Sequence, residues 1–206
     1  MRAHVLFLAG SKRGLVGGGG LCYTRCVMKR LHLILLLFAA LRVVAADPEV
    51  VPAEQIARKW KRTKSINGPT EKIRKGLEVE VGTQPVEVKV DADTAVSFQN
   101  IQFQRDSAEL LDGVTAAQIG EIARAMKQAG SERFLIEGHT CDLGSDAHNL
   151  GLSQQRALAV KRALEWHGVE PGRLQVLGFG ESDPVIANTD ETARAKNRRV
   201  QIYRKL

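Results

Sequence analysis

The chain has 206 residues, of which 44% are hydrophobic and 26% are charged, and its formal net charge is +7. This composition is typical of a globular protein and excludes a collagen-like, disordered or multi-spanning chain. The positive charge is confined to residues 1–46, which hold seven basic and no acidic side chains, whereas residues 47–206 hold 23 of each. Because binding through nucleic-acid phosphates requires a basic excess, the balanced remainder argues against a nucleic-acid partner.

Residues 28–46 contain the three parts of a secretory signal peptide. Met28 is followed by two basic residues, an apolar run over 31–41 and small residues before Asp47. A helix of that run is about 16 Å long, roughly half the thickness of a bilayer core, which favours a signal peptide over a permanent anchor. Residues 1–27 have none of these parts, so we expect them to be a non-native upstream extension. The mature protein is therefore expected to be exported and to begin near Asp47.

Cys141 is the one cysteine between residues 47 and 206, so that part of the chain cannot form an internal disulfide. Cys22 and Cys26 precede the expected start, and no second pair of ligands accompanies them. We therefore expect neither a disulfide framework nor a metal or other cofactor.

Residues 47–95 are interpreted as an N-terminal appendage or linker. A polar and basic stretch predicts a short helix over about 53–64, and Gly68-Pro69 predicts a turn. The alternation of valine with charged residues over 78–90 has a period of two, which is typical of a strand, although Gly82 and Pro85 interrupt it.

Residues 96–206 show a regular alternation of strand and helix patterns. The expected elements, in chain order, are a strand over 96–103, a helix over about 111–126, a strand over 133–137, a polar loop over 139–151, a helix capped by Ser153, a strand over 174–177, a loop over 178–196 and a strand over 199–203. This order predicts an α/β fold of the βαβαββ type. We expect a small two-layer sandwich, in which both helices pack on one face of a mixed sheet.

Four sequence blocks carry a resemblance to a known family. They are Phe-Gln-Arg-Asp-Ser at 103–107, the polar block at 138–157, Gly-Phe-Gly-Glu followed by Pro184 at 178–184, and Asn-Arg-Arg-Val at 197–200. In this order and spacing, residues 96–206 closely resemble the OmpA-like peptidoglycan-binding domain. The resemblance implies non-covalent binding of peptidoglycan through the diaminopimelate of its stem peptide, and no enzymatic activity. Peptidoglycan and possible outer-membrane or envelope proteins are the implied partners. The implied location of the exported chain is the periplasm, with association with the outer membrane as a further expectation.

The resemblance also implies a set of ligand-binding residues. Arg156 matches the arginine that grips the ligand carboxylate, Asn149 matches a loop asparagine, and Arg199 matches an arginine that lines the same site. Thr140 belongs to the same loop, in which its hydroxyl shapes the backbone or contacts the ligand. A guanidinium can hold a carboxylate through two parallel hydrogen bonds, which suits it to this role.

The chain departs from the family at the position of the aspartate that pairs with the ligand amine. Cys141 occupies that position, and Asp142 follows one residue later. A neutral thiol cannot replace a carboxylate at neutral pH. Either the loop is reset so that Asp142 supplies the charge, or amine recognition is weakened and binding depends on Arg156. An envelope protein that has kept the fold but lost ligand binding is the alternative function.

A catalytic or metal site is the competing interpretation of the same loop. His139, Cys141, Asp142 and His148 could supply a nucleophile with a base, or a set of metal ligands. No oxyanion-stabilising element and no second histidine–carboxylate pair is recognisable in the sequence. We therefore expect no catalytic residues and no metal ligands here.

Overall fold

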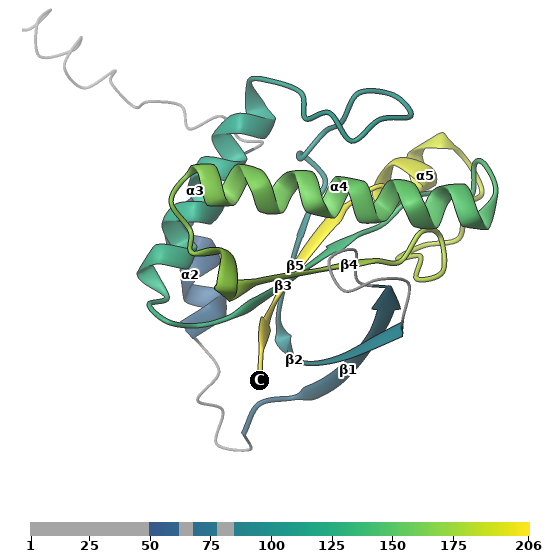
Figure 1. Ribbon diagram of the computed structural model, residues 1–206. Coiled ribbons are helices and arrows are strands. Elements are labelled where there is room, and N and C mark those ends of the chain that lie inside the picture. The colour runs from purple at the N-terminus through teal and green to yellow at the C-terminus, as the bar shows by residue number, and fades with distance from the viewer. Residues whose placement is uncertain (1–49, 62–67, 78–84) are drawn as a thin grey trace, which may run out of the picture. The chain divides into compact units, whose positions relative to one another are not determined.

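The computed structural model describes residues 50–61, 68–77 and 85–206 (Figure 1). The expected upstream extension and signal peptide lie outside these residues. Residues 78–84 of the strand predicted over 78–90 also lie outside them. No helix within the described ranges is long and apolar enough to cross a membrane.

Five strands alternate with four α-helices in the described part of the chain. In order, the elements are α2 (Ala53–Lys61), β1 (Glu71–Leu77), β2 (Pro85–Phe98), α3 (Val114–Gln128), β3 (Phe134–Gly138), α4 (Asp146–Trp166), a short 3-10 helix η1 (Pro171–Arg173), β4 (Leu174–Gly178), α5 (Glu191–Asn197) and β5 (Val200–Lys205).

The strands form one curled mixed sheet in the order β1-β2-β5-β3-β4. The β3 and β4 strands are parallel, and the other neighbouring pairs are antiparallel. The two outer strands, β1 and β4, meet at the single pair Leu77 and Gly178. The mixed α/β sheet predicted from the sequence is therefore confirmed, with one further strand, β1.

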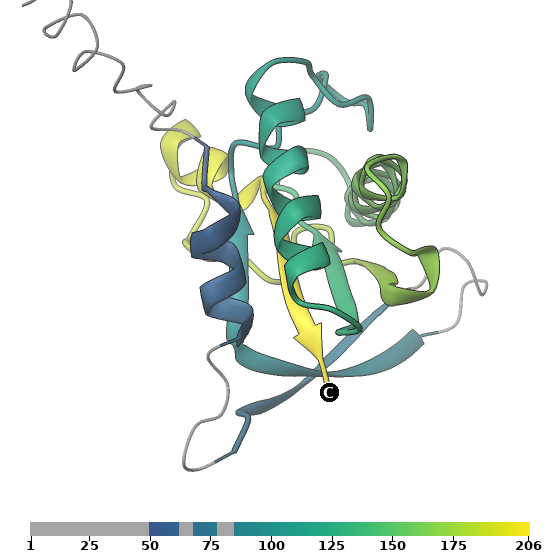
Figure 2. The ribbon, with the colours of Figure 1, turned by 90° about the vertical axis from the view of Figure 1, so that its left-hand side faces the viewer.

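The helices α2, α3 and α4 lie in a row on one side of the sheet (Figure 2). Alternate residues of the central strands point to this side, including Phe134 and Ile136 of β3 and Ile202 of β5, and they form the main core with the helices. Trp60 of α2 lies in this core with its ring 4.5 Å from that of Phe134. Helix α2 thus belongs to the same core, although its residues fall in the stretch interpreted as an appendage.

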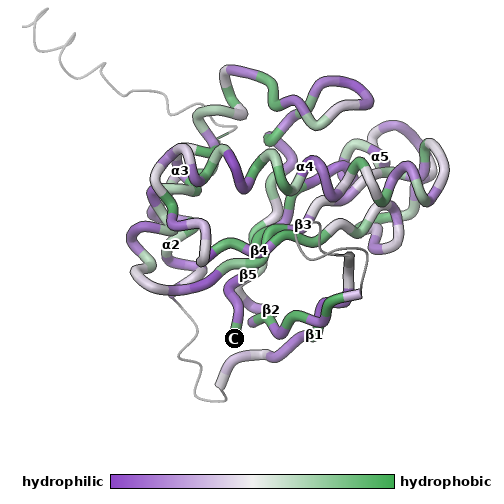
Figure 3. Tube along the Cα trace, in the orientation of Figure 1, coloured by the Kyte–Doolittle hydropathy of each residue, from purple (hydrophilic) through white to green (hydrophobic). Residues whose placement is uncertain are grey.

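The opposite side of the sheet is covered by the β1–β2 hairpin. Leu135, Leu177 and Tyr203 point to this side and pack against Val88 and Val90 of β2. Because both sides are covered, β3 is buried along its whole length, and the central strands are the most hydrophobic segments of the trace in Figure 3. A strand that is covered on both faces has a continuous apolar sequence, as Phe-Leu-Ile does here.

Three predicted boundaries are wrong. The second long helix begins at Asp146 rather than near Ser153, because Ser145 is its N-cap and accepts a hydrogen bond from the backbone N–H of His148. The strand predicted over 96–103 ends at Phe98, and the predicted loop over 178–196 contains most of α5. Asp190 caps α5 by accepting a hydrogen bond from the backbone N–H of Ala193.

Candidate functional site

Two glycines bring the ends of β3 and β4 into direct contact with α4. A Cβ atom on Gly138 would lie 2.1 Å from the backbone oxygen of Ser153, and one on Gly178 would lie 2.2 Å from Cγ of Gln154. Ser153 is buried in the middle of α4, where its hydroxyl accepts a hydrogen bond from the backbone N–H of Gly180. This close approach fixes the loop after β3 against the first turns of α4.

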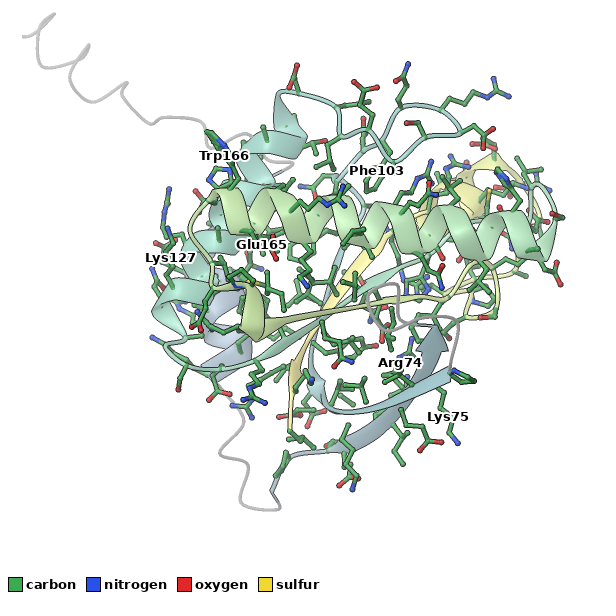
Figure 4. All side chains as sticks on the ribbon, in the orientation of Figure 1. Arg74, Lys75, Phe103, Lys127, Glu165 and Trp166 are labelled. Carbon is green, nitrogen blue, oxygen red and sulfur yellow. The ribbon has the colours of Figure 1, made fainter. Side chains whose placement is uncertain are left out.

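A cleft of about 760 Å³ opens beside this loop. Among the predicted site residues, Thr140, Cys141, Asn149 and Arg156 line it. Phe103, in the segment between β2 and α3, also lines the cleft, and its side chain is labelled in Figure 4. The structure therefore brings four of the six predicted residues to one cavity.

Arg156 lies in the third turn of α4 and not in the first, because the helix begins earlier than predicted. Its Nε donates a hydrogen bond to the backbone oxygen of Ser107 at 2.9 Å, and its guanidinium lies 5.0 Å from the centre of the Phe103 ring. Burial lowers the pKa of Arg156, and the nearby charge of Arg198 lowers it further. Within the described part of the chain, no carboxylate is within ion-pair distance of Arg156, so this partly buried cation is available to an anion.

Asn149 holds the loop after β3 in place through two hydrogen bonds. Its Nδ2 donates hydrogen bonds to the backbone oxygen of Cys141 at 3.2 Å and to Oε2 of Glu181 at 2.5 Å. The hydroxyl of Thr140 is buried and has no hydrogen-bond partner among the described residues. Asn149 thus has a clear role in holding the loop, whereas the Thr140 hydroxyl does not.

Cys141 and Asp142 point in different directions. Cys141 is buried and lines the cleft, where Nη1 of Arg198 donates a hydrogen bond to its sulfur at 3.8 Å. Asp142 does not line the cleft, and its Oδ1 accepts a hydrogen bond from Nε of Arg194 at 2.8 Å. That bond holds the pKa of Asp142 below its usual value. The side chain next to the arginines of the cleft is consequently a thiol.

Arg199 lies behind the cleft in a smaller, adjoining hollow. It is buried, and its guanidinium donates hydrogen bonds to Gln201 and to the backbone oxygens of Asn197 and Asp183. Burial lowers the pKa of Arg199. Its neighbour Arg198 lines both cavities and pairs with Glu191 at 2.6 Å.

Sequence reasoning missed several charged residues of the site. Arg198 stands in the Asn-Arg-Arg-Val block with no role assigned to it, whereas it lines the cleft. Arg105, Asp106 and His148 also line it, and Nε2 of His148 lies 2.8 Å from Oδ1 of Asp106. The available signal was their position inside the sequence blocks, Arg105 and Asp106 at 103–107, His148 at 138–157 and Arg198 at 197–200.

Of the four residues that suggested a catalytic or metal site, Cys141 and His148 line the cleft, whereas Asp142 and His139 do not. His148 pairs with Asp106 at the cleft, Asp142 pairs with Arg194, and His139 is buried with its ring stacked on Phe179 at 5.3 Å. The described residues contain no group of three or more histidine, cysteine or acidic side chains placed to hold a metal ion.

A second feature that the sequence did not predict is a buried charge network on the hairpin side of the sheet. Arg74 of β1 donates hydrogen bonds to both oxygens of Glu137 at 2.6 and 2.7 Å, and to Asp183 at 2.7 Å. Its guanidinium also lies 4.3 Å from the centre of the Phe179 ring. Burial by itself would lower the pKa of Arg74, but the bonds from the two carboxylates raise it above its usual value. This network ties the hairpin to the strand that leads into the site loop.

Comparison with known proteins identifies the family. The OmpA family model matches residues 102–198. The chain is 39% identical over 125 residues to outer membrane porin F of Pseudomonas aeruginosa, which covers 57% of this chain and 35% of the porin. It is 32% identical over 108 residues to the peptidoglycan-associated lipoprotein of Haemophilus influenzae, which covers 52% of this chain and 70% of the lipoprotein.

The chain spans less than two thirds of the length of the first curated relatives that it matches. A solved structure of the periplasmic domain of Helicobacter pylori MotB has a TM-score of 0.50 and 20% identity, covering 66% of this chain and 88% of that domain. This likeness concerns the fold alone. Together, the family match and the coverage of the Haemophilus relative show that this chain belongs to the OmpA family.

Proposed function

We propose that the chain binds peptidoglycan non-covalently through the diaminopimelate of the stem peptide, and so tethers the envelope to the cell wall. The single observation that carries the proposal is Arg156, a partly buried guanidinium without a carboxylate partner among the described residues, in the wall of a 760 Å³ cleft. A desolvated guanidinium binds a carboxylate more strongly than one in water, because the pair is less screened. The name of the Haemophilus relative, a peptidoglycan-associated lipoprotein, supports the choice of ligand.

The proposal includes a specific weakness at the ligand amine. The side chain that lies beside the arginines is the neutral Cys141, and the carboxylate of Asp142 is engaged by Arg194 outside the cleft. We propose that binding rests on the carboxylate side of the ligand and that Asp142 does not hold its amine. The signal peptide predicted over residues 28–46, which lies outside the described residues, supports a periplasmic location in which the wall is accessible.

The test is a pull-down with insoluble peptidoglycan that contains diaminopimelate, using the full chain. We expect wild type to be retained and Arg156→Ala to be lost from the pellet. Arg162→Ala is the matched control, because Arg162 lies on the same helix and is exposed to solvent. Retention of Arg156→Ala at the wild-type level would refute the role of the cleft.

A second pair of variants tests the amine. Cys141→Asp restores a carboxylate beside the cleft and is expected to tighten binding, by about 1.5–3 kcal/mol if it forms one charged hydrogen bond. Asp142→Ala is expected to leave binding nearly unchanged. If wild type is not retained but Cys141→Asp is, the chain is an envelope protein that has kept the fold and lost the ligand.

A further inference from the structure

A hollow of about 270 Å³ lies at the end of the sheet that is far from the cleft. Its lining includes the 3-10 helix η1, the start of β4 and the end of β5, whereas the loop of the cleft follows the opposite end of β3, which runs parallel to β4. We call this cavity the η1 hollow. Four basic side chains from four separate segments line it, namely Arg133, Lys161, Arg173 and Lys205.

The described residues that line the η1 hollow include neither aspartate nor glutamate. Three acidic side chains stand close to it in the fold or in the sequence. The carboxylate of Glu165 is 4.0 Å from Nζ of Lys161, at the outer limit of an ion pair. That of Glu132 is 3.8 Å from Nη1 of Arg204, and Glu170 is exposed. The basic lining is therefore not matched by acidic side chains of the hollow itself.

Arg173 holds its guanidinium in place without a carboxylate. Its Nε donates a hydrogen bond to the backbone oxygen of Glu132 at 2.8 Å, and its Nη2 donates one to the backbone oxygen of Met126 at 2.7 Å. The group also lies 5.6 Å from the centre of the Phe134 ring. No carboxylate among the described residues is within ion-pair distance of it. A planar cation that is fixed in this way loses little freedom when it binds an anion, which favours binding.

Lys161 and Arg133 add positive charge to the same space in different ways. Lys161 is only 6% exposed, and lysines are seldom buried to this extent. Arg133 is exposed, and its guanidinium makes no hydrogen bond or ion pair with the described residues. Like charges that converge on one space repel one another, and a bound anion replaces this repulsion by attraction. The lining thus favours an anionic ligand.

We propose that the η1 hollow binds a phosphate group, either as free phosphate or as part of an anionic lipid headgroup. A phosphate group is tetrahedral, so its oxygens accept hydrogen bonds from cations that surround it on several sides. A carboxylate has two oxygens in one plane and is better suited to a single guanidinium fork. A volume of about 270 Å³ is room for a phosphate group together with several water molecules. Because the hollow is separate from the cleft, this proposal stands independently of the proposed function.

Nuclear magnetic resonance locates the binding. The isotopically labelled full chain is titrated with inorganic phosphate at constant ionic strength, with chloride as the balancing anion. The readout is the shift of the backbone amides of Gly172 and Leu174, which line the hollow, so that phosphate bound elsewhere on the chain is not counted. We expect saturable shifts in wild type. In Arg173→Gln the half-saturating concentration is expected to rise at least about tenfold, through the loss of one charged hydrogen bond.

Two further variants complete the test. Arg133→Gln is expected to fold as wild type does, because its side chain is exposed, and to raise the half-saturating concentration about threefold. This variant decides the matter if Arg173→Gln does not fold. Arg162→Gln is the matched control, because Arg162 is an exposed neighbour of Lys161 that does not line the hollow, and it is expected to stay within about twofold of wild type.

Three results would overturn the site. They are the absence of saturable shifts in wild type, an unchanged half-saturating concentration in the variants of Arg133 and Arg173, and an equal rise in Arg162→Gln, which would be an effect of net charge. Acetate tests the preference for phosphate, because acetate that bound as tightly as phosphate would overturn the assignment to a phosphate group.

Glycerophosphoglycerol, the soluble headgroup of phosphatidylglycerol, separates the two sources of phosphate. If it shifts the same amides and displaces phosphate, the lipid headgroup is the source, and if it does neither, free phosphate is the source. Retention by peptidoglycan is expected to be unchanged in Arg133→Gln, because the hollow is at the other end of the sheet. Failure of this site and failure of the proposed function are therefore observed separately.

Discussion

The ion pair between Arg74 and Glu137 allows a quantitative prediction about how the hairpin is held on the sheet. The Glu137 side chain is fully buried and that of Arg74 is 6% exposed. Arg74→Met keeps much of the length of the side chain but leaves the Glu137 carboxylate without its main partner. Removal of one member of a buried ion pair costs about 3–5 kcal/mol. This is a large part of the 5–15 kcal/mol by which domains are typically stable.

Two further variants isolate the cause. Arg74→Met combined with Glu137→Leu removes both charges and is expected to recover most of the loss, because a buried pair can often be replaced by apolar side chains of similar volume. Lys75→Ala is the neighbouring control. Lys75 lies on the outer side of β1 (Figure 4), and its bridge to Glu87 is exposed at both ends, so it is expected to cost less than about 1 kcal/mol.

Urea unfolding followed by tryptophan fluorescence measures these differences. Trp60 is buried against Phe134 and reports on loss of the core, whereas Trp166 is 79% exposed and changes little. The reasoning is refuted if Arg74→Met lies within about 1 kcal/mol of wild type. It is refuted equally if the double variant is no more stable than Arg74→Met alone, because the cost would then not come from the unpaired carboxylate.

Two other predictions concern the elements next to the site. Gly138→Ala should lower the free energy of unfolding by about 1–3 kcal/mol, because its Cβ would collide with the Ser153 carbonyl. Gly151→Ala places its Cβ in open space on α4 and should raise the free energy of unfolding by about 0.5–1 kcal/mol. Urea midpoints that rank the two variants the other way would contradict this packing. Burial lowers the pKa of His139, so the unfolded chain binds its proton first, and stability that is present above pH 6.5 should decline as the pH falls below it, by at most about 1.4 kcal/mol per pH unit. Unfolding curves between pH 7.5 and 5.5 should show a smaller slope in His139→Asn, and an unchanged slope would refute the assignment to this side chain.

The sequence predicted the elements whose patterns are local. The apolar run ending at Glu137 identified β3, and the helical spacing of Ile119, Ile122 and Met126 identified α3. The start of α4 was missed because its first turns are polar and contain Gly151, which reads as a loop, while Ser153 resembles a cap. Ser153 is in fact buried within the helix, where its hydroxyl accepts a hydrogen bond from the Gly180 backbone.

The site was predictable only in part for a related reason. Arg156 and Asn149 stand in a recognisable block, and both line the cleft. The directions of the Cys141 and Asp142 side chains were not predictable, because Asp142 is engaged by Arg194, 52 residues later in the chain. Arg74 was missed because an arginine in a charged strand suggests a solvent-exposed face, and its partner Glu137 is 63 residues away.

The place of β5 in the sheet has a consequence for how the chain folds during synthesis. This strand follows the other described strands in sequence, yet it lies between β2 and β3 and pairs with both. Until residues 200–205 have emerged, the hairpin and the β3–β4 pair have no strand to join them, and the main core lacks Val200 and Ile202. Pairings between distant parts of a chain form slowly, because closing a long loop costs entropy before any contact is gained. The nascent chain therefore cannot complete its sheet until β5 has been synthesised, however early its other strands emerge.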